Sequence, residues 1–357
     1  MATAPTYFSD FLSAIRLSDN QVSDLKTGHT TLRKRLLADE DLSPIIVSTF
    51  LQGSYRRSTA VKPKNGNKSD VDIIVVTNLD SEITTPEEAL DKFIPFLEKH
   101  YAEKYRKQGR SLGISLSYVD LDIVPTSAPS ETVQEELSSE ELISESTIEE
   151  NFTFFSSSED SSWKDEPLLI PDREADEWDK THPLEQIRWT VEKNKRCNGH
   201  YINVVKALKW WKKVMCPDMK HPKSYPLEHF IGDCCPDGIV SVAEGVVLTL
   251  EKIVNYYPTK PFLADRGVPE HDVFGRLSDD DYSDFYVSVC DAAKKAREAY
   301  DCEDLHESVS KWRNLFGSMF PEPPTKENNS MNGFSKRTER TTEIPSCLLY
   351  TSPSPRD

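Results

Sequence analysis

The sequence predicts an α+β fold: a mixed sheet with helices in the N-terminal half, an all-helical C-terminal half, and two lobes with a central cleft. Three short apolar runs typical of strands lie at residues 45–52, 71–79 and 112–125. From residue 199 onward, apolar residues recur at helical spacing instead. Between the two regions the composition shifts to acidic residues and serine. We therefore expect a core domain over 1–165 and a helical domain over 166–322.

Helices are expected on both sides of the first two apolar runs. Ser18 and Gln21 form a capping-box pattern, and the apolar residues after it recur at helical spacing to about Ala38. A second helix is expected over 85–104, with a kink at Pro95. The N-terminal half therefore alternates helices with strands.

The three apolar runs differ in character. Residues 45–52 read as a strand that ends at a Gly-Ser pair, and 71–79 as a near-continuous apolar strand covered on both faces. Residues 62–69 are rich in Lys, Asn, Gly and Pro, so they are expected to form a loop. Residues 112–125 read either as one long strand or as two strands joined by a bend.

The C-terminal half is expected to consist of helices. A segment around Trp178, Ile187 and Trp189 is expected to be helical and to lead into them. The other expected helices share an amphipathic pattern and cover residues 199–215, 241–257 and 280–300, with another entered from the loop 223–232 and a last short one ending at 317–320.

Two terminal segments are expected to lie outside the folded part. Residues 323–346 are dominated by Pro, Asn, Ser and Thr, which is typical of a disordered tail. Residues 347–357, CLLYTSPSPRD, resemble the translation of a sequencing-library adaptor found in metagenomic assemblies. We expect them to be a non-native scar that replaces the original C-terminus.

The net charge limits the partners. Lys and Arg total 43 against 60 Asp and Glu, which gives a net charge of −17. Such an acidic chain is a poor general binder of long nucleic acid, because that binding depends on phosphate neutralisation. A local cluster of lysines still suits small nucleotides. No run of about 18 apolar residues occurs, so no membrane span is expected.

The segment 131–160 has ten acidic residues and no Lys or Arg. We expect an acidic surface insertion over about 131–165. The alternative is an acidic lid that becomes ordered when substrate binds.

Cysteine usage indicates a cytoplasmic protein. The seven cysteines are odd in number and irregularly spaced, and the N-terminus has no basic and apolar segments typical of a secretory signal. A zinc site is an alternative for five residues that lie close together: His221, His229, Cys216, Cys234 and Cys235. Their spacing lacks a C-x-x-C pair, so buried thiols and surface histidines are the favoured interpretation. A monomer is the default.

Aspartates in two strands form the candidate catalytic centre. Asp70 and Asp72 are one residue apart at the head of a strand, so they share a face of the sheet. Asp122 lies in the third apolar run, with Asp120 as a neighbour without an assigned role. Carboxylates held so close repel each other, and a shared divalent cation relieves the repulsion.

These motifs resemble those of the DNA polymerase β-like nucleotidyltransferases. The pattern that they share is G-S, then D-x-D, then an aspartate, here Asp122, followed by two apolar residues and proline. Within that superfamily, the chain resembles the bacterial cGAS/DncV-like nucleotidyltransferases (CD-NTases), and among these the clade D enzymes. Segments that carry the resemblance include STFLQGSYRRSTA, SDVDIIVVTNLD, KWWKK, YPLEH and KWRNLFGSMFP, over most of residues 5–322.

The resemblance implies roles for individual residues. Asp70, Asp72 and Asp122 would hold two Mg²⁺ ions, with Mn²⁺ as an alternative, and Asp122 would be the general base. The residues that match nucleotide-binding positions are Gly53 and Ser54 for phosphate, Lys209 for the donor triphosphate, Ser224 for phosphate and Tyr225 for base stacking. Arg57-Ser58-Thr59 stands where many members have a Gly-Thr pair, and Arg57 is a further nucleotide-binding candidate. The residues leave open whether the Arg56-Arg57 pair contacts phosphate or the acidic insertion. Without the family, a solvated lysine or a core tyrosine would explain Lys209 or Tyr225.

The resemblance also implies the activity and partners. We expect an enzyme that condenses ATP, with or without GTP, into a 3′–5′ cyclic trinucleotide in anti-phage (CBASS) signalling, with an effector that binds the product. HORMA-like proteins with an AAA+ remodeller, or a ubiquitin-transferase-like enzyme, are the implied regulators. A nucleotidyltransferase that modifies tRNA or protein is the rival enzyme, and an inactive nucleotide-binding scaffold is the rival without activity.

Overall fold

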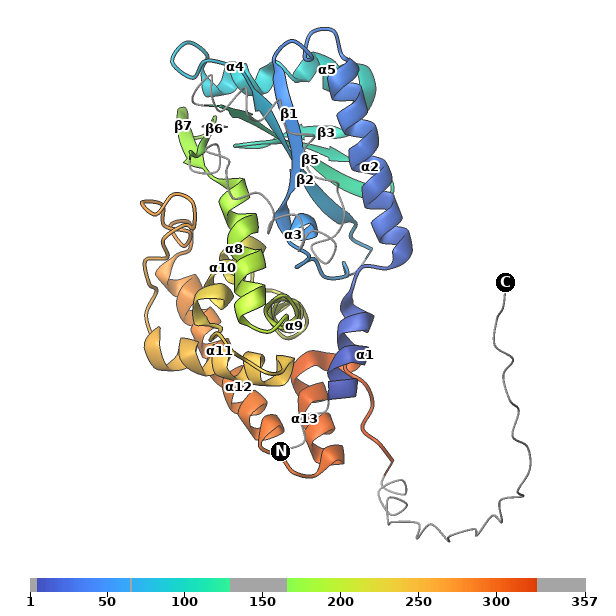
Figure 1. Ribbon diagram of the computed structural model, residues 1–357, viewed down its shortest axis with the longest axis vertical. Coiled ribbons are helices and arrows are strands. Elements are labelled where there is room, and N and C mark those ends of the chain that lie inside the picture. Colours follow the sequence, from blue (N-terminus) through green and yellow to red (C-terminus); the bar gives the residue numbers. More distant parts are fainter. Residues whose placement is uncertain (1–4, 65, 129–165, 326–357) are drawn as a thin grey trace, which may run out of the picture. The chain divides into compact units, whose positions relative to one another are not determined.

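The computed structural model describes residues 5–64, 66–128 and 166–325 of the chain. In this part, the residues up to Pro323 form one compact unit (Figure 1). The acidic insertion, most of the expected tail and the expected scar lie outside the described residues.

A seven-stranded mixed sheet is the centre of the N-terminal half. Its main strands lie in the order β1-β2-β5-β4-β3, and β6 and β7 extend it from β5. The pair β2 and β5 is parallel and the other pairs are antiparallel. The strands are β1 (Ile46–Gln52), β2 (Ser69–Thr77), β3 (Tyr105–Lys107), β4 (Leu112–Ser115), β5 (Val119–Ser127), β6 (Leu168–Asp172) and β7 (Glu177–Thr181).

Helix α2 (Asp19–Ala38) lies along one face of this sheet (Figure 1). Ser18 and Gln21 form the expected capping box, and Leu25, Leu32 and Leu36 are buried against the sheet residues. At Gly28 an added Cβ would meet Val119 Cγ1 at 2.8 Å, so a glycine allows the helix to approach β5 closely. This apolar packing between α2 and the sheet supports the strands that carry Asp70, Asp72 and Asp122.

The expected helix over 85–104 is two helices, α4 (Pro86–Asp91) and α5 (Ile94–Tyr101). Pro95 has no N–H to donate to the turn before it, and its ring conflicts with the carbonyl four residues earlier. The helix therefore ends at Asp91, and Pro95 occupies the first turn of α5. The expectation of one kinked helix was wrong, although the position of the break was anticipated.

The third apolar run is two strands joined by a turn, which was one of the two expected forms. β4 and β5 pair antiparallel, with Gly113 opposite Asp122. The fold class is confirmed by this sheet and the helices that follow it.

The expected helical segment around Trp178, Ile187 and Trp189 is confirmed at Ile187 and Trp189, which lie in a helix. It is wrong at Trp178, where the sheet continues as β6 and β7. The β7 residues Glu177–Thr181 pair antiparallel with β6, with Glu177 opposite Asp172 and Thr181 opposite Leu168. The Trp178 indole nitrogen donates to the Thr84 carbonyl at 2.8 Å, which ties β7 to the start of α4. Strands thus extend past residue 165, and helix α8 (Pro183–Arg196) begins only after them.

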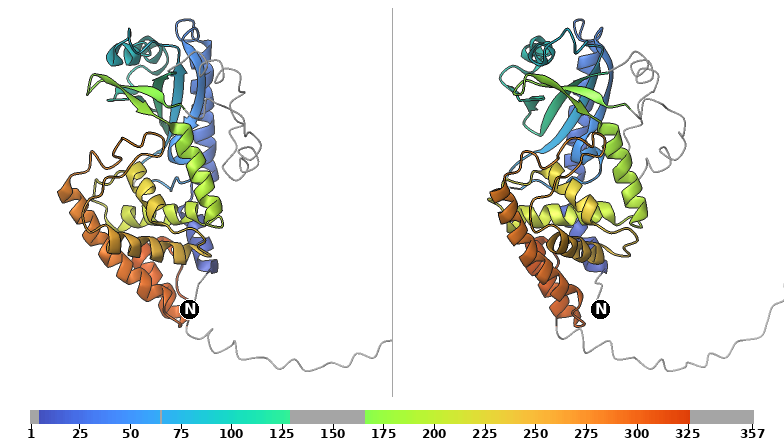
Figure 2. Two further views of the ribbon diagram at one scale, coloured as in Figure 1. Left: turned by 60° about the vertical axis from the view of Figure 1, so that its left-hand side comes forward. Right: turned by 90° about the vertical axis from the view of Figure 1, so that its left-hand side faces the viewer.

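The helical half packs around one apolar cluster. Its members come from α8, α9 (Tyr201–Met215), α10 (Ser224–Cys234), α11 (Val242–Tyr256), α12 (Asp279–Tyr300) and α13 (Leu305–Phe316), and include Phe320, which follows the short η2 (Gly317–Met319). The first helix, α1 (Pro5–Ile15), belongs to this cluster too, although it comes first in the sequence. The Phe8 ring meets the Trp312 ring edge-on at 5.0 Å, and Figure 2 shows α1 close to α13. The chain therefore starts in the helical half and then enters the sheet.

Candidate functional site

Four aspartates stand side by side on two parallel strands. The register pairs Asp70 of β2 with Asp120 of β5, and Asp72 with Asp122. Because side chains alternate between faces along a strand, all four project from the same side of the sheet. The three carboxylates expected to bind metal are therefore neighbours in space.

Burial and mutual repulsion act on these carboxylates. Burial, and then the charges of Asp122 and Asp70, raise the pKa of Asp72 from 3.8 to about 7. Burial also raises the pKa of Asp122; Arg106 opposes that shift and Asp70 adds to it. Negative charge here is therefore unfavourable until a cation compensates it.

The donor set suits Mg²⁺, which prefers carboxylate oxygens. Among the described residues, no group of three or more His, Cys, Asp or Glu side chains is arranged to hold a metal ion. One carboxylate has another partner, because Asp122 Oδ1 accepts a hydrogen bond from Gln108 Nε2 at 2.8 Å. The three residues fit the ion in type and charge, since a cation would relieve the repulsion at Asp72, but their side chains are not gathered around one point.

Asp120 differs from the other three aspartates. Its Oδ1 accepts hydrogen bonds from Ser115 Oγ at 2.6 Å and from Lys68 Nζ at 3.2 Å. Its charge is therefore compensated by the protein itself. This separates Asp120 from the metal-binding candidates and makes it a matched control for them.

The Gly-Ser pair opens the short helix α3 (Gly53–Arg56) directly after β1. Gly53 has a φ of +78°, which favours glycine, and an added Cβ would lie 1.9 Å from Asp72 Oδ2. The Ser54 carbonyl accepts hydrogen bonds from the amides of Thr59 and Ala60, which closes the turn. The backbone of this turn is thereby held against the carboxylate of Asp72.

Arg57, which follows α3, is directed into the interior. Its side chain is 4% exposed, and its Nε lies 2.7 Å from Glu228 Oε1 of α10. Its guanidinium also lies over the Tyr225 ring, 5.3 Å from the centroid. Burial by itself would lower the pKa of Arg57, but Glu228 outweighs it and the pKa is raised. The partner of Arg57 in the described structure is thus Glu228.

Lys209 is buried rather than solvated. It lies on α9, is 8% exposed, and its Nζ is 3.5 Å from Glu228 Oε2. Burial lowers the pKa of Lys209, and the Glu228 charge opposes that change while Arg57 reinforces it. The simple alternative of a solvated lysine is therefore wrong for this residue.

Ser224 and Tyr225 open α10. Ser224 is exposed, and the helix has no acidic residue in its first turn and no side-chain cap at Lys223. The Tyr225 hydroxyl donates to Asp265 Oδ2 at 2.7 Å, and its ring meets His229 edge-on. These contacts fix the ring, which is half-buried and reaches a cavity.

Two cavities meet at Lys223. The smaller, about 330 Å³, is lined by Lys209, Ser224 and four further lysines, and no Asp or Glu lines it. The larger, about 680 Å³, is lined by Tyr225, Asp265, Gln186 and residues of β7. The first has the charge expected of a phosphate site, and the second has room for a nucleoside-sized group.

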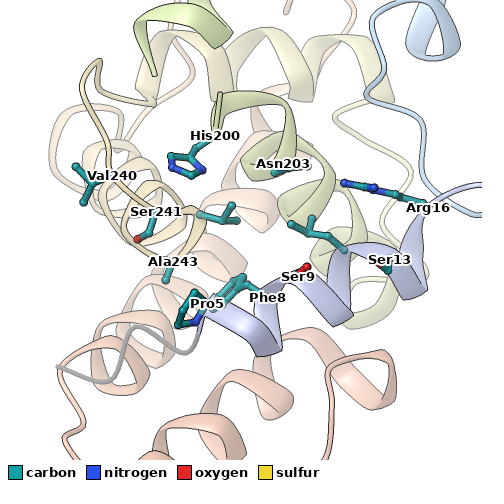
Figure 3. A pocket seen from close by; sticks show the side chains of 12 residues that line it. Pro5, Phe8, Ser9, Ser13, Arg16, His200, Asn203, Val240, Ser241 and Ala243 are labelled. Atoms are coloured by element: carbon teal, nitrogen blue, oxygen red, sulfur yellow. The ribbon is translucent and has the colours of Figure 1, made fainter. Parts of the chain in front are cut away.

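A third cavity of about 280 Å³ lies between α1 and the beginnings of α9 and α11. Figure 3 shows Phe8, Arg16, His200 and Ser241 around it. None of the site residues expected from the sequence lines this cavity. It is therefore separate from the carboxylates and the buried ion pair.

Three of the five residues considered for zinc are buried: His229, Cys234 and Cys235. The His229 ring lies 3.0 Å from the Ala264 carbonyl through Nε2. Burial raises the pKa of Cys234 to about 12, so its thiol stays protonated. Cys235 is buried as well. The favoured interpretation of buried thiols fits these two cysteines.

Sequence reasoning missed several residues of the site. Glu228 was part of the quoted YPLEH segment, but no role was given to it. Thr59 Oγ1 donates to Glu228 Oε2 at 2.7 Å, and Gln52 Nε2 donates to Gln186 Oε1 at 3.0 Å. For Glu228, the available signal was a glutamate inside a mostly apolar helical stretch. The pairing of Gln52 with Gln186 leaves no local pattern.

Comparison with known proteins gives a consistent result. Residues 1–154 match the Second Messenger Oligonucleotide or Dinucleotide Synthetase domain family. A cyclic AMP-AMP-GMP synthase of Enterobacter hormaechei subsp. hoffmannii is 46% identical over 360 residues, which cover 92% of this chain and 94% of that protein. A cyclic AMP-AMP-AMP synthase of Acinetobacter sp. is 30% identical over 329 residues, covering 89% and 86% respectively.

Solved structures share the fold at low identity. The CdnC chain of the E. coli MS115-1 CdnC:HORMA-deltaN complex has a TM-score of 0.63 and 17% identity, with 89% of this chain and 98% of that chain covered. The Vibrio cholerae di-nucleotide cyclase DncV, bound to ATP, GTP and 5MTHFGLU2, has a TM-score of 0.59 and 14% identity, with 77% and 71% covered. These likenesses concern the fold.

Proposed function

Because the chain belongs to the bacterial cGAS/DncV-like nucleotidyltransferases, we propose that it condenses ATP and GTP into a cyclic trinucleotide with Mg²⁺ as its cofactor. It is a nucleotidyltransferase that makes a cyclic oligonucleotide. The observation that carries the finer proposal is the pairing of Asp72 with Asp122 on parallel strands, beside Asp70 and against the Gly53 turn.

The reaction forms a bond between the 3′-oxygen of one nucleotide and the α-phosphorus of the next, and releases pyrophosphate. Asp70, Asp72 and Asp122 would hold the cation. When bound, Mg²⁺ lowers the pKa of the attacking hydroxyl and compensates the charge of the leaving group. Asp122, whose pKa is raised by burial, accepts the hydroxyl proton.

Other residues of the chain position the nucleotide. The backbone of Gly53 and Ser54 approaches the phosphates, since no side chain stands between it and Asp72. Lys209 and Ser224 line the lysine-rich cavity, which suits the triphosphate of the donor. Tyr225 borders the larger cavity, where its ring would stack on a base. After the linear product forms, it turns round and the closing step repeats the same chemistry.

The names of the relatives support one choice of bases. The synthases 45–46% identical to this chain are named for cyclic AMP-AMP-GMP, while the one at 30% identity is named for cyclic AMP-AMP-AMP. We therefore assign two adenines and one guanine to the product, and a role in anti-phage signalling to it. The CdnC:HORMA-deltaN neighbour makes a HORMA-like protein the first regulator to test.

The test is incubation of the full chain with the four NTPs and Mg²⁺, followed by phosphatase and chromatography. We expect a phosphatase-resistant product that is lost with EDTA and in Asp70→Asn and Asp72→Asn. Asp120→Asn is the matched control and keeps activity, because Asp120 is compensated by Lys68 and Ser115. Transfer of label to tRNA or to protein instead, or no product even with added HORMA-like partners, contradicts the proposal.

A further inference from the structure

One buried carboxylate of α10 has no role in the chemistry described above. Glu228 is 3% exposed and has three side-chain partners. Arg57 Nε lies at 2.7 Å, Thr59 Oγ1 at 2.7 Å and Lys209 Nζ at 3.5 Å. Burying a carboxylate costs several kcal/mol before its partners compensate that cost, so a replaceable structural contact would be better made by apolar residues. The position of the partners suggests a different reason for the charge.

The three partners come from two parts of the site. Arg57 and Thr59 follow the Gly53–Ser54 turn, and the Ser54 carbonyl accepts from the Thr59 amide. Lys209 lies on α9 and lines the lysine-rich cavity. Glu228 therefore joins the turn beside Asp72 to the lysine that faces the cavity. The Tyr201 hydroxyl, which donates to the Glu228 carbonyl at 3.3 Å, holds the same segment from α9.

Lys209 depends on this carboxylate for its charge. Burial and the neighbouring Arg57 cation both disfavour the protonated lysine, whereas Glu228 and Asp70 favour it. Lys213, also on α9, adds a further positive charge nearby. Charged and titratable groups surround Glu228 and Lys209 on all the elements that pack against them. These groups are Arg57, Asp70, Asp72, Tyr201, Lys213, Tyr225 and Arg266. Glu228 is the anion in direct contact with Lys209.

We propose that Glu228 is a positioning residue: it keeps Lys209 charged and directed toward the nucleotide triphosphate, while Arg57 and Thr59 hold the Glu228 carboxylate in place. The inference rests on the proposed function for the identity of the anion. It adds a residue that acts through Lys209 and does not itself touch the reacting atoms. The neutral isostere Glu228→Gln tests it, because glutamine keeps the size and part of the hydrogen bonding but removes the charge.

Removal of the Glu228 charge is expected to make ATP binding depend on pH. In Glu228→Gln, Lys209 would lie beside Arg57 without an anionic partner, and its pKa would fall further below that of a free lysine. Lys209 would then lose its proton at a lower pH than in the wild type. Loss of one hydrogen bond between Lys209 and the triphosphate corresponds to ATP binding that is about tenfold or more weaker.

The experiment measures binding of ATP in the presence of Ca²⁺ to the full chain, by titration calorimetry. Compared with the wild type, Glu228→Gln is expected to bind within about threefold at about pH 6.5 and about tenfold or more weakly at about pH 9. In a Lys209→Gln background, Glu228→Gln is expected to add little at either pH, because its effect passes through Lys209. Thermal unfolding of each variant verifies that it is folded.

Two matched controls separate this role from simple packing. Thr59→Val removes a neutral donor to the same carboxylate, so it should lower the melting temperature without making ATP binding depend on pH. Asp237→Asn removes the partner of the buried Lys193 in another ion pair, which none of the site residues joins, and should leave ATP binding unchanged. If Thr59→Val produced the same pH dependence, packing would explain the effect and the inference would fail.

The outcomes for binding and for synthesis are distinct. If Glu228→Gln binds ATP like the wild type at about pH 9, or if its effect persists in the Lys209→Gln background, the inference is wrong even when the wild type makes a cyclic product. If the wild type binds ATP and makes no cyclic product, the proposed function is wrong and the binding comparison still decides the inference. A wild type that does not bind ATP overturns both.

Discussion

Replacing Asp72 by asparagine should abolish synthesis and at the same time stabilise the metal-free protein. The side chain is half-buried between Asp70 and Asp122, and its pKa is raised from 3.8 to about 7 by burial and by these two charges. A raised folded-state pKa means that the ionised form is destabilised by folding. Asparagine has the same shape and no charge, so it removes this cost.

The size of the expected stabilisation follows from the raised pKa of Asp72. About three pKa units at about 1.4 kcal/mol each give an upper limit of about 4 kcal/mol. Solvent reaches part of the carboxylate, and the repulsion is shared with Asp122 and Asp70, so about 1–2 kcal/mol is expected at about pH 8. The gain is absent near pH 4, because Asp72 is protonated in the folded state and half-protonated in the unfolded one. It grows as the pH rises from about 4 through about 7.

Urea denaturation with EDTA, at about pH 4.5 and about pH 8, measures the effect. The free energy of unfolding of Asp72→Asn should exceed that of the wild type only at the higher pH. Added Mg²⁺ should stabilise the wild type and not the variant, because the cation compensates the repulsion. If the wild type and Asp72→Asn are equally stable at both pH values, or if Mg²⁺ stabilises both equally, the reasoning is refuted. Asp72 would then not be a carboxylate that is destabilised until a cation binds.

Two further predictions concern single residues. Gly53→Ala should reduce turnover by about a hundredfold or more, with a smaller effect on the melting temperature. The reason is that the alanine Cβ would lie 1.9 Å from Asp72 Oδ2, at a residue whose φ is +78°. Unchanged turnover would contradict the close approach of the Gly53–Ser54 turn to the Asp72 carboxylate. Phe8→Ala should lower stability by about 3–4 kcal/mol in urea denaturation, because the ring packs on Trp312 in the apolar cluster of the helical half. It should leave the Michaelis constant for ATP unchanged at low temperature, because that cluster contains no residue of β2 or β5, the strands that carry the aspartates. A loss below about 1 kcal/mol would show that α1 is not part of that core.

The sequence predicted those features that local patterns specify. The capping box at Ser18 and Gln21 located α2, and the period of two along a strand placed Asp70 and Asp72 on one face. The register that puts Asp72 opposite Asp122 is set by the whole sheet, so the sequence could suggest a triad but not its arrangement.

Features that depend on distant contacts were not predicted. Glu228 meets Arg57 across 171 positions of the chain, and neither residue carries a local signal for the other. The strand β7 was mistaken for a helix, because a half-buried strand with Trp178 and Pro183 nearby has no run of apolar residues. The packing of α1 on α13 depends on aromatic rings at the two ends of the folded part.

The central claim is that the site joins nucleotides and then closes the ring. The ratio of released pyrophosphate to incorporated nucleotide tests this most directly, because ring closure breaks one further phosphoanhydride. A cyclic product requires one pyrophosphate for every nucleotide incorporated, whereas a linear trinucleotide that retains its 5′-triphosphate releases two for every three. We predict the first ratio, together with a product mass that corresponds to two adenosine and one guanosine monophosphate residues. The second ratio, or a labelled macromolecule in place of a small product, would contradict the account.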